Sequence, residues 1–267
     1  MGAPSEALNL VEIFWSVQGE GVHVGVPSAF VRLGECDLRC AWCDSVETWM
    51  PAKRVRVEAE PGTGAFDEAE NPTPVDFAAA AVTRLMGASR GLVSITGGEP
   101  LLQPRAVASL ARALRAAGGD RWRLLLETHG LAVDALDEVL GVVDIVSMDW
   151  KLASDVRRAS DPRHGEVSPF HDQHERFLDR ASRHERTDVY VKVVLTRSSR
   201  DDEIDEACRR IARVAPATPL ILQPVTPHGP VRETPSAEAM LRWLRRCQEI
   251  LEDVRVVPQT HKSLGVL

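Results

Sequence analysis

The sequence lacks the features that place a chain in or across a membrane. No apolar run reaches the roughly 18 residues that a bilayer-spanning helix needs. Residues 1–6 have neither the basic nor the apolar region of a secretory signal. A basic excess is also missing, because the formal net charge is -7. These absences argue against membrane and nucleic-acid partners, and they favour a cytoplasmic protein that binds a small molecule.

Cysteine is scarce, and its odd number does not suit a disulfide framework. Of the 5 cysteines, Cys208 and Cys247 each lie on the apolar face of a helical pattern, which indicates buried structural thiols. Cys36, Cys40 and Cys43 instead form a C-x3-C-x2-C motif. A [4Fe–4S] cube normally takes four cysteines, so three of them would leave one iron open to a small molecule.

The same three thiols could also hold zinc. A C-x2-C pair with a fourth ligand such as Asp44 or His23 completes a tetrahedral site. The segment Gly97-Gly98-Glu99-Pro100, about one βα unit downstream, favours the cluster. Adjacent glycines let the backbone approach a ligand, and the carboxylate of Glu99 accepts from an ammonium group. Spacing alone does not exclude zinc.

Apolar runs typical of buried strands recur along the chain. They cover residues 29–33, 92–96, 123–128, 144–148, 189–195, 220–223 and 254–257. Helical patterns lie between most of them, so we predict an α/β fold whose parallel strands form an incomplete (β/α)6-type barrel. Residues 1–267 are expected to form a single domain, with an N-terminal extension and inserted loops.

Proline and glycine mark the expected helix ends. Thr73-Pro74 and Thr234-Pro235 each predict an N-cap followed by the first helical residue. Pro104 predicts a further helix start, and Gly118-Gly119 predicts its end.

Two polar stretches, 51–74 and 153–188, interrupt the βα pattern and are expected to be inserted surface segments. The second stretch carries several histidines, namely His164, His171, His174 and His184. Their charged neighbours favour a solvated loop and helix over a metal site.

Polar segments follow successive predicted strands and should meet at one rim, because the carboxyl ends of parallel strands lie together. The cysteine motif and Gly97-Gly98-Glu99-Pro100 together resemble the radical S-adenosylmethionine superfamily. The resemblance implies that S-adenosylmethionine binds the open iron through its amino and carboxylate groups. It also implies that an electron from the cluster cleaves this cofactor to a 5′-deoxyadenosyl radical, while the protein positions and shields the reaction.

A narrower resemblance begins with residues 12–21 and continues through Gly25-Val26-Pro27 and Phe30-Val31-Arg32-Leu33. These segments are similar to the 7-carboxy-7-deazaguanine synthase family, and the match runs from residue 12 to residue 267, interrupted by the two polar stretches. The resemblance implies a lyase that converts 6-carboxy-5,6,7,8-tetrahydropterin to 7-carboxy-7-deazaguanine with release of ammonia. This reaction belongs to the biosynthesis of queuosine, a modified nucleoside of tRNA.

The same resemblance implies roles for residues at matching positions. The expected [4Fe–4S] ligands are Cys36, Cys40 and Cys43, and Ser45 is the expected Mg²⁺ ligand. The expected S-adenosylmethionine contacts are Trp42, Cys43, Asp44, Gly98, Glu99, Asp149, Trp150, Lys151, Gln223, Pro224, Val225 and Thr226. The expected substrate contacts are Val17, Gln18, Gly19, Glu20, Arg32, Thr96 and Leu267. Within this set, Arg32 is expected to pair with the substrate's carboxylate, and Leu267 to contribute a terminal carboxylate.

Several positions depart from the family pattern. Glu35 stands where a glycine usually precedes the first cysteine, and Asp149-Trp150 stands where Ser-Pro usually precedes the lysine. His129 replaces a usual asparagine, and Ser45 replaces a more common threonine. Serine keeps an oxygen that suits Mg²⁺, although Asp44-Ser45 could also be a plain helix cap.

Partners and alternatives follow from the same resemblance. It implies an external electron donor such as flavodoxin or ferredoxin, and a homodimer. A glycyl-radical activating enzyme is the nearest alternative, but Gln18 and Arg32 argue against it. A non-catalytic zinc-stabilised binding protein is a second alternative. No residue can be assigned as the proton acceptor.

Overall fold

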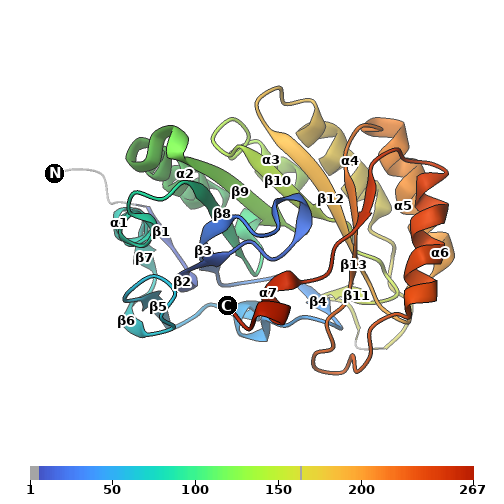
Figure 1. The fold of residues 1–267 in the computed structure, drawn as a ribbon, viewed down its shortest axis with the longest axis horizontal. Coiled ribbons are helices and arrows are strands. Elements are labelled where there is room, and N and C mark those ends of the chain that lie inside the picture. Colours follow the sequence, from blue (N-terminus) through green and yellow to red (C-terminus); the bar gives the residue numbers. More distant parts are fainter. Residues whose placement is uncertain (1–5, 163) are drawn as a thin grey trace.

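The computed structural model describes residues 6–162 and 164–267. Residues 1–5, where no secretory signal was expected, lie outside this part of the chain. The described residues are built on one large curved sheet with helices along its outer side (Figure 1). No helix within them has both the length and the apolar character needed to cross a bilayer.

The large sheet has 10 strands in the order β14-β13-β12-β10-β9-β8-β3-β2-β5-β6. Their bounds are Leu10–Val17 (β2), Pro27–Leu33 (β3), Arg54–Glu58 (β5), Phe66–Glu70 (β6), Gly91–Gly97 (β8), Trp122–Thr128 (β9), Ile145–Asp149 (β10), Asp188–Leu195 (β12), Leu220–Pro224 (β13) and Val254–Val256 (β14). From β3 to β14 every neighbouring pair is parallel. The antiparallel pairs are β2 with β3 and β5 with β6.

Two short sheets complete the strands of the described residues. In one, β1 (Ala7–Leu8) pairs with β7 (Thr73–Pro74). In the other, β4 (Leu38–Cys40) pairs with β11 (Val156–Arg158). The second sheet ties the segment after β3 to a segment more than a hundred residues later, and it therefore matters for the cysteine motif.

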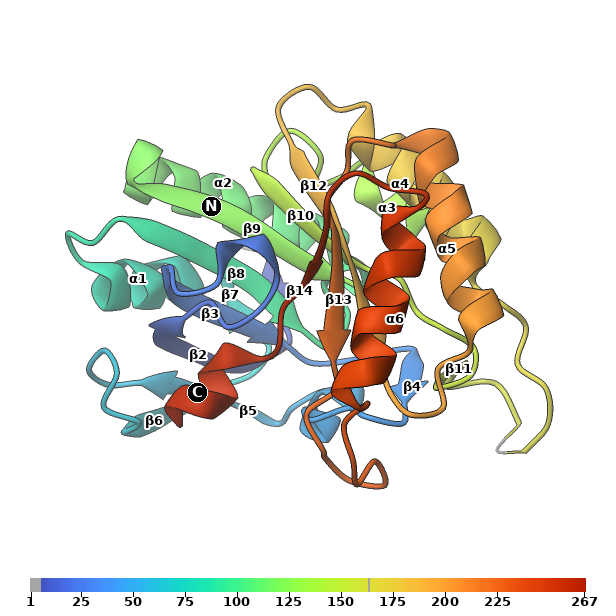
Figure 2. The same ribbon diagram turned by 45° about the vertical axis from the view of Figure 1, so that its right-hand side comes forward.

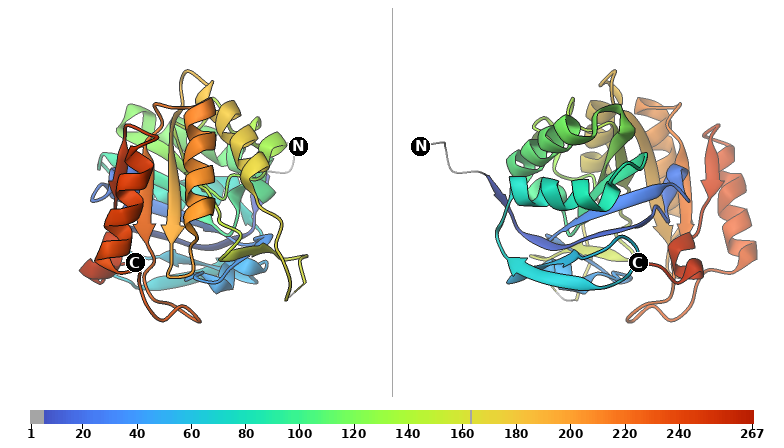
Figure 3. Two further views of the ribbon diagram at one scale, coloured as in Figure 1. Left: turned by 90° about the vertical axis from the view of Figure 1, so that its right-hand side faces the viewer. Right: turned by 60° about the vertical axis from the view of Figure 1, so that its left-hand side comes forward.

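Helices cover the outer face of the large sheet (Figure 3). They are α1 (Val75–Met86), α2 (Pro104–Gly118), α3 (Val133–Leu136), α4 (His171–Ser182), α5 (Asp201–Val214) and α6 (Ala237–Gln248). The last helix, α7 (Thr260–Leu264), lies apart from them, at the end of the sheet toward which the arrowheads of β12 and β13 point (Figures 2 and 3). β4 lies at the same end, so the carboxyl ends of the parallel strands face β4 and α7.

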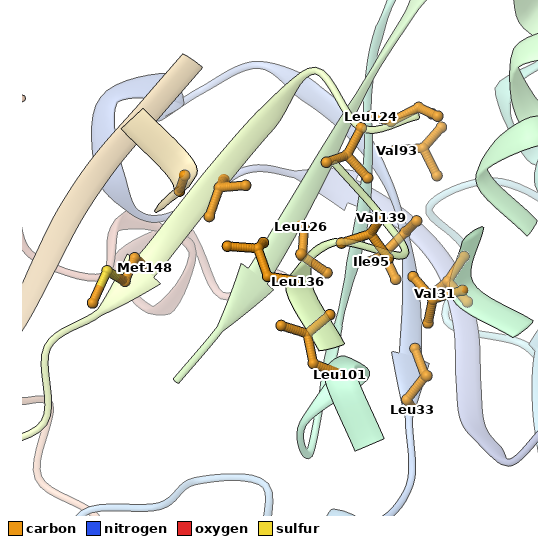
Figure 4. Packing of buried hydrophobic residues seen from close by; sticks show 14 of the residues in the cluster. Val31, Leu33, Val93, Ile95, Leu101, Leu124, Leu126, Leu136, Val139 and Met148 are labelled. Carbon is orange, nitrogen blue, oxygen red and sulfur yellow. The ribbon is translucent and has the colours of Figure 1, made fainter. Parts of the chain in front are cut away.

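The core lies between the sheet and these helices. Ile95 and Leu126, from the central strands β8 and β9, are fully buried and lie near Leu136 of α3 and Val139 (Figure 4). Branched side chains fill this layer because both faces of a parallel strand are covered. Truncating a residue such as Leu126 to alanine would destabilise the fold by about 2–5 kcal/mol.

The predicted strands are confirmed as β3, β8, β9, β10, β12, β13 and β14. The prediction of burial is wrong for β14, in which only Val254 is buried. The mixed α/β class and the predominance of parallel pairing are confirmed with them. The N-terminal extension is more than a leader to this sheet, because β2 is one of its strands. The described sheet ends at β14 on one side and at β6 on the other, where each pairs with a single neighbour.

The expected insertions are partly ordinary secondary structure. Within 51–74, β5 and β6 form a hairpin that extends the large sheet beyond β2. Within 153–188 lie β11 and α4. The expectation of solvated histidines is wrong for His171 and His174, which are 9% and 0% exposed. They pack against Trp150, whose indole N–H donates to His171 Nδ1 at 3.0 Å.

Two predicted helix starts are displaced. Thr73 belongs to β7, and α1 begins at Val75. At α6 the cap is Ser236, whose hydroxyl accepts from the backbone N–H of Ala239 at 3.1 Å. The predictions for α2 are confirmed, since it begins at Pro104. Cys208 and Cys247 are confirmed as buried residues of α5 and α6.

Candidate active site

The three clustered cysteines lie on the segment that follows β3. Cys36 precedes β4, Cys40 ends it, and the backbone N–H of Cys43 donates to the carbonyl oxygen of Cys40 at 3.2 Å. Ala41 donates to the carbonyl oxygen of Asp155 at 2.9 Å, next to the pairing of β4 with β11. This segment, residues 34–45, is called the cysteine loop below. Its shape depends on pairing with β11.

All three cysteines line one cavity at the carboxyl ends of the parallel strands, called the first cavity below. Its empty volume is about 980 Å³, with the open mouth included. Burial raises the pKa of the Cys36 thiol to about 11 and that of Cys40 to about 12. Thiols in such surroundings ionise when a bound metal compensates the charge.

The arrangement fits an iron–sulfur cluster better than a single ion. Among residues 6–162 and 164–267, no three His, Cys, Asp or Glu side chains form a group that could hold one metal ion. Zinc would need sulfur ligands at about 2.3 Å from a common point. In a [4Fe–4S] cube each thiolate ligates its own iron, so the three thiols need not converge on one point.

Most of the expected S-adenosylmethionine contacts line the first cavity. They are Trp42, Cys43, Asp44, Gly98, Asp149, Lys151, Gln223, Val225 and Thr226. The side chain of Gln223 is 3% exposed, and its Oε1 has no hydrogen-bond partner. An unpartnered buried acceptor is costly unless a ligand donates to it. S-adenosylmethionine offers ammonium and hydroxyl donors, so the cavity fits this cofactor.

The remaining expected contacts, Glu99, Trp150 and Pro224, are not part of the cavity lining. Glu99 is fully buried, and its carboxylate accepts from the hydroxyl of Thr128 at 2.7 Å and from the backbone N–H of His129 at 2.8 Å. It therefore ties β8 to the end of β9. The indole of Trp150 is directed at α4.

A ladder of alternating charges crosses the floor of the first cavity. Lys151 Nζ lies 2.7 Å from Asp149 Oδ2, and Lys192 Nζ lies 3.1 Å from Asp149 Oδ1. Lys192 also pairs with Glu20, whose other oxygen accepts from the Gln259 amide at 2.7 Å. Lys151 is further held over the Trp42 ring, with Nζ 4.6 Å from its centroid. We call Glu20, Lys192, Asp149 and Lys151 the charged ladder.

Mutual pairing keeps the charged ladder ionised despite its burial. Burial alone would raise the pKa of both carboxyl groups. Lys192 instead lowers the pKa of Glu20 below its ordinary value, and Lys151 followed by Lys192 lowers that of Asp149. Burial would likewise lower the pKa of Lys151 and Lys192, but Asp149 raises both, helped at Lys192 by Glu20. The ladder thus presents fixed charges to the cavity.

A second cavity adjoins the first. Every expected substrate contact lines it, namely Val17, Gln18, Gly19, Glu20, Arg32, Thr96 and Leu267. Its empty volume is about 870 Å³, with the open mouth included. The wall common to both cavities consists of Glu20, Arg32, Asp44, Ser45, Thr96, Glu127 and Gln259. Ligands in the two cavities would therefore be neighbours.

Arg32 is held in place before any ligand arrives. Its Nε donates to Glu12 at 2.9 Å, and its Nη1 lies 3.5 Å from the Ser45 hydroxyl. The guanidinium also sits 5.6 Å from the centroid of the Phe14 ring. Because Glu12 takes the Nε side, the terminal nitrogens are left facing the cavity, where they suit an anionic group.

Ser45 begins the 3₁₀ turn Val46–Trp49, but its side chain makes no capping hydrogen bond. Its hydroxyl instead donates to Asp44 Oδ1 at 3.2 Å. Two side-chain oxygens, from a carboxylate and a hydroxyl, therefore lie together on the wall common to both cavities.

Glu127, which no motif singled out by itself, is a central acceptor of the second cavity. Its carboxylate accepts from Gln18 Nε2 at 2.9 Å, from the Ser94 hydroxyl at 2.5 Å and from the Thr96 hydroxyl at 3.1 Å. Residues of β8 thus orient it toward Gln18. The signal in the sequence was a glutamate close to the end of an apolar strand.

The C-terminal segment closes one side of the second cavity. The backbone N–H of Thr260 donates to the Gly19 carbonyl oxygen at 2.9 Å, and the Ser16 hydroxyl donates to the carbonyl oxygen of Leu267 at 2.7 Å. Lys262 Nζ lies 3.1 Å from Asp44. α7 is therefore attached both to β2 and to the cysteine loop.

Gly98, the residue after β8, shows why a glycine is needed at the end of this strand. A Cβ at this position would lie 2.0 Å from the carbonyl oxygen of Glu35, so the two segments pack backbone to backbone. Glu35 itself has a φ of 74°, the one positive value among the non-glycine residues that the structure describes. The close approach of Gly98 and the left-handed conformation of Glu35 therefore occur at the same turn of the cysteine loop.

His129, another departure from the family, supports the same loop. Its Nε2 lies 2.8 Å from Asp37 Oδ1, and the interaction lowers the pKa of Asp37. The ring lines the first cavity. Among the residues that sequence reasoning missed, Lys192 and Gln259 are the most consequential. The signal for Lys192 was a lysine in the middle of an otherwise apolar strand.

Comparison with known proteins gives matches to a family profile, to curated relatives and to solved structures. A profile described as a 4Fe-4S single cluster domain matches residues 17–166. The 7-carboxy-7-deazaguanine synthase of Geobacter sulfurreducens is 35% identical over 261 residues, which cover 97% of both chains. The enzyme of the same name from Methanopyrus kandleri is 35% identical over 275 residues, covering 100% of this chain and 97% of that protein.

The fold has solved counterparts. The crystal structure of QueE from Escherichia coli superposes with a TM-score of 0.55 at 21% sequence identity, covering 96% of this chain and 94% of that one. At this level of identity the likeness concerns the arrangement of the chain. It places the large sheet and its helices within a known architecture.

Proposed function

Since the chain belongs to the family of 7-carboxy-7-deazaguanine synthases, we propose that it converts 6-carboxy-5,6,7,8-tetrahydropterin to 7-carboxy-7-deazaguanine with release of ammonia. One observation carries the proposal. The residues expected to contact the substrate line a single cavity, and this cavity has a common wall with the one lined by the cysteines. A pterin there would lie beside S-adenosylmethionine.

The cofactors define what the protein must do. When bound, the [4Fe–4S] cluster and S-adenosylmethionine would supply the radical chemistry of the reaction. Cys36, Cys40 and Cys43 would hold the cluster, while Gln223 and Asp149 would offer acceptors to S-adenosylmethionine.

The substrate's planar ring calls for fixed donors and acceptors. In our proposal Arg32 pairs with the substrate's carboxylate. Glu127 accepts hydrogen bonds from the N–H groups of the pterin ring, and the backbone of Val17 to Gly19 bonds to the ring's amide group. Glu12 and Ser94 would orient these groups beforehand. Holding the ring at a fixed distance from the radical is the main contribution the chain can make to the rate.

Finer features belong to the same proposal. Asp44 and Ser45 would offer oxygen ligands to a Mg²⁺ that bridges to the substrate. Leu267 would contribute its terminal oxygens, which lie at the Ser16 hydroxyl. The curved sheet would act as an incomplete six-unit barrel within a single domain of residues 1–267. The protein would work as a homodimer with an external donor such as flavodoxin or ferredoxin.

The direct test is an anaerobic assay of the iron-reconstituted, C-terminally untagged protein. It contains S-adenosylmethionine, dithionite, Mg²⁺ and carboxytetrahydropterin, and mass spectrometry reads the products. Formation of 7-carboxy-7-deazaguanine is expected. Formation of 5′-deoxyadenosine alone would support the radical chemistry but reject the proposed substrate. If cluster-loaded protein formed neither product, the proposed reaction would be rejected.

A matched variant separates binding from folding. Glu127→Gln keeps the size of the side chain but replaces an acceptor-only carboxylate with an amide, so the loss of product should exceed tenfold, about 1.4 kcal/mol in kcat/KM. Uncoupled formation of 5′-deoxyadenosine should persist, because the first cavity keeps its cysteines. The nearly full-length synthase relatives give no support to the two alternatives, a glycyl-radical activating enzyme and a zinc-stabilised binding protein.

A further inference from the structure

Two residues that follow neighbouring strands reach the cysteine loop from the sheet. His129 comes directly after β9, and its Nε2 lies 2.8 Å from Oδ1 of Asp37, which precedes β4. Lys151 comes shortly after β10, and its Nζ lies 4.6 Å from the ring centroid of Trp42, which follows β4. Both residues line the first cavity. The position of the cysteine loop over the cavity therefore depends on how these two backbones are held.

Both backbones meet one nitrogen of α4. His174 is fully buried, and its Nε2 lies 3.0 Å from the carbonyl oxygen of His129 and 3.3 Å from the backbone nitrogen of Lys151. In the tautomer that carries a proton on Nε2, this atom donates to the carbonyl oxygen. In the other tautomer it accepts from the backbone N–H. His129 and Lys151 are themselves buried, so water cannot readily take the place of the imidazole.

The imidazole is held firmly by its surroundings. Its centroid lies 4.9 Å from the ring of Trp150 and 6.1 Å from that of Phe170. A Cβ on Gly130 would lie 3.4 Å from the Cδ2 of His174, so the backbone after His129 packs on the ring. Burial holds the pKa of His174 well below its ordinary value, and the ring is therefore neutral.

The other ring nitrogen shows that an imidazole is costly at this position. Nδ1 of His174 is buried without a hydrogen-bond partner. An apolar side chain of similar size would avoid that cost. The helix does not need the imidazole for docking, because Phe177, Leu178 and Ala181 already bury its inner face. What histidine adds is the contact of Nε2 with the two strand ends.

We propose that His174 is a positioning residue of the active site, which holds the ends of β9 and β10 through Nε2 and so keeps the cysteine loop in the shape that receives the cluster and S-adenosylmethionine. The inference rests on the proposed function, because it concerns the cofactors of that reaction. His174 lines neither ligand cavity, so it acts through His129 and Lys151. It belongs to the polar stretch 153–188, which sequence reasoning took for a solvated insertion.

The test compares three variants of α4. In His174→Phe a ring of similar size fills the space without a nitrogen. In His174→Gln an amide reaches the place of Nε2 and offers both a donor and an acceptor. His171→Phe removes the other buried imidazole of the helix, which accepts from the Trp150 indole instead. It is the matched control, because it costs a buried hydrogen bond without loosening the two strand ends.

Two measurements report on the cysteine loop without turnover. Hydrogen–deuterium exchange of residues 34–45 is followed in the iron-free protein. The dissociation constant for S-adenosylmethionine is measured by calorimetry on anaerobic, cluster-loaded protein without reductant. For His174→Phe we expect both the exchange rate and the dissociation constant to rise by about tenfold or more. His174→Gln should lie within about threefold of wild type, and His171→Phe within about twofold even if its melting temperature falls.

The outcomes that would overturn the proposal are distinct. Unchanged loop exchange in His174→Phe would show that the imidazole does not hold the loop. An equal change in His171→Phe would show that the effect follows from lost stability. If His174→Phe does not fold, His174→Asn replaces it, because the shorter amide cannot reach the place of Nε2. A loop exchange rate in His174→Asn equal to that in His174→Gln would then overturn the proposal.

Failure of the proposed function would look different. If wild-type protein bound S-adenosylmethionine but formed no deazapurine, the substrate assignment would be rejected. Loop exchange in the iron-free variants would still report on His174, because it requires neither cofactor nor pterin.

Discussion

Glu35 combines a glycine-like backbone with a full side chain. Its φ of 74° lies in the left-handed region, where an L-residue is strained by roughly 1–2 kcal/mol. The turn is required because Gly98 packs against the Glu35 carbonyl oxygen and Glu99 donates to it at 2.8 Å. The family's usual glycine at this position therefore has a conformational reason, and the departure in this chain carries a cost in stability.

We predict that Glu35→Gly stabilises the protein, because relief of the backbone strain contributes about 1 kcal/mol. The greater entropy that glycine gives the unfolded chain offsets part of this gain. The melting temperature of the iron-free protein should rise by roughly 2 °C. The control is Glu185→Gly, at an exposed turn residue with ordinary φ, which should lower the melting temperature or leave it unchanged. A lower melting temperature for Glu35→Gly would show that the turn is not strained.

Lys192 is a buried cation that holds two carboxylates. It is 5% exposed and pairs with Glu20 and Asp149. Removing one member of such a buried set leaves the others uncompensated. We predict that Lys192→Met destabilises the protein by about 3 kcal/mol in chemical denaturation at pH 7, whereas Lys53→Met, at an exposed lysine, should have little effect.

The effect of Lys192 should depend on pH in a defined way. Glu20 and Asp149 have folded-state pKa values below the ordinary 4.5 and 3.8, so their pairing stabilises the protein above those values and is lost as the pH falls further. The raised pKa of Lys192 keeps its contribution up to at least pH 10.5. The difference in unfolding free energy between wild type and Lys192→Met should be constant between these limits and shrink below about pH 4. A difference that does not vary over the acid range would contradict the ladder.

At the level of single residues, the sequence identified groups with a distinctive chemistry and missed those defined by their neighbours. The cysteine spacing could be picked out because three clustered thiols have few ordinary uses, whereas Arg32 was identified through the family resemblance. Lys192 and Glu127 could not, because their importance arises when strands distant along the chain lie side by side. Trp150 was expected to contact the cofactor because Asp149-Trp150-Lys151 stands at a matching family position, but its indole N–H donates to His171 of α4 instead.

Among the elements, α7 depends on a single close approach. A Cβ on Gly19 would lie 1.9 Å from His261 Nδ1 and 2.8 Å from its Cβ, so the side chain could not simply rotate away. We predict that Gly19→Ala displaces α7, speeds tryptic cleavage at Lys262 and raises the KM for the pterin by about tenfold or more. The unfolding free energy should change little, because α7 has no buried residues.

A double-mutant cycle tests the cause. On a His261→Ala background the clash is absent, so adding Gly19→Ala should have a much smaller effect on proteolysis and on KM than it has in wild type. Equal effects on both backgrounds would mean that Gly19 acts in some other way.

Elements with a strong periodic pattern were predictable, and those positioned by tertiary contacts were not. The parallel strands appear close to their expected bounds because most of their residues are apolar and buried on both faces of the sheet. The hairpin of β5 and β6 was missed because its outer strand is acidic and exposed. The start of α1 was misplaced because Thr73 pairs with Leu8 of β1, a contact that no local rule anticipates.

The molecule as a whole has one main core. The largest buried cluster takes residues from Leu8 of β1 to Val254 of β14 and from all six outer helices, α1 to α6. Since the large sheet links the described elements from β2 to β14, we predict that the iron-free protein unfolds in one cooperative transition. Urea unfolding curves from circular dichroism and from tryptophan fluorescence should coincide. Two separated transitions would instead indicate that part of the chain folds independently.

The wall common to the two cavities has a thermodynamic consequence. Glu20, Asp44 and Gln259 face both spaces, so a ligand in either one alters the side chains that the other ligand meets. By reciprocity, if the nucleoside cofactor changes the affinity for the pterin by some factor, the pterin changes the affinity for the cofactor by the same factor. Each dissociation constant therefore depends on whether the other ligand is bound. Calorimetric titrations in either order of addition must give the same total binding free energy.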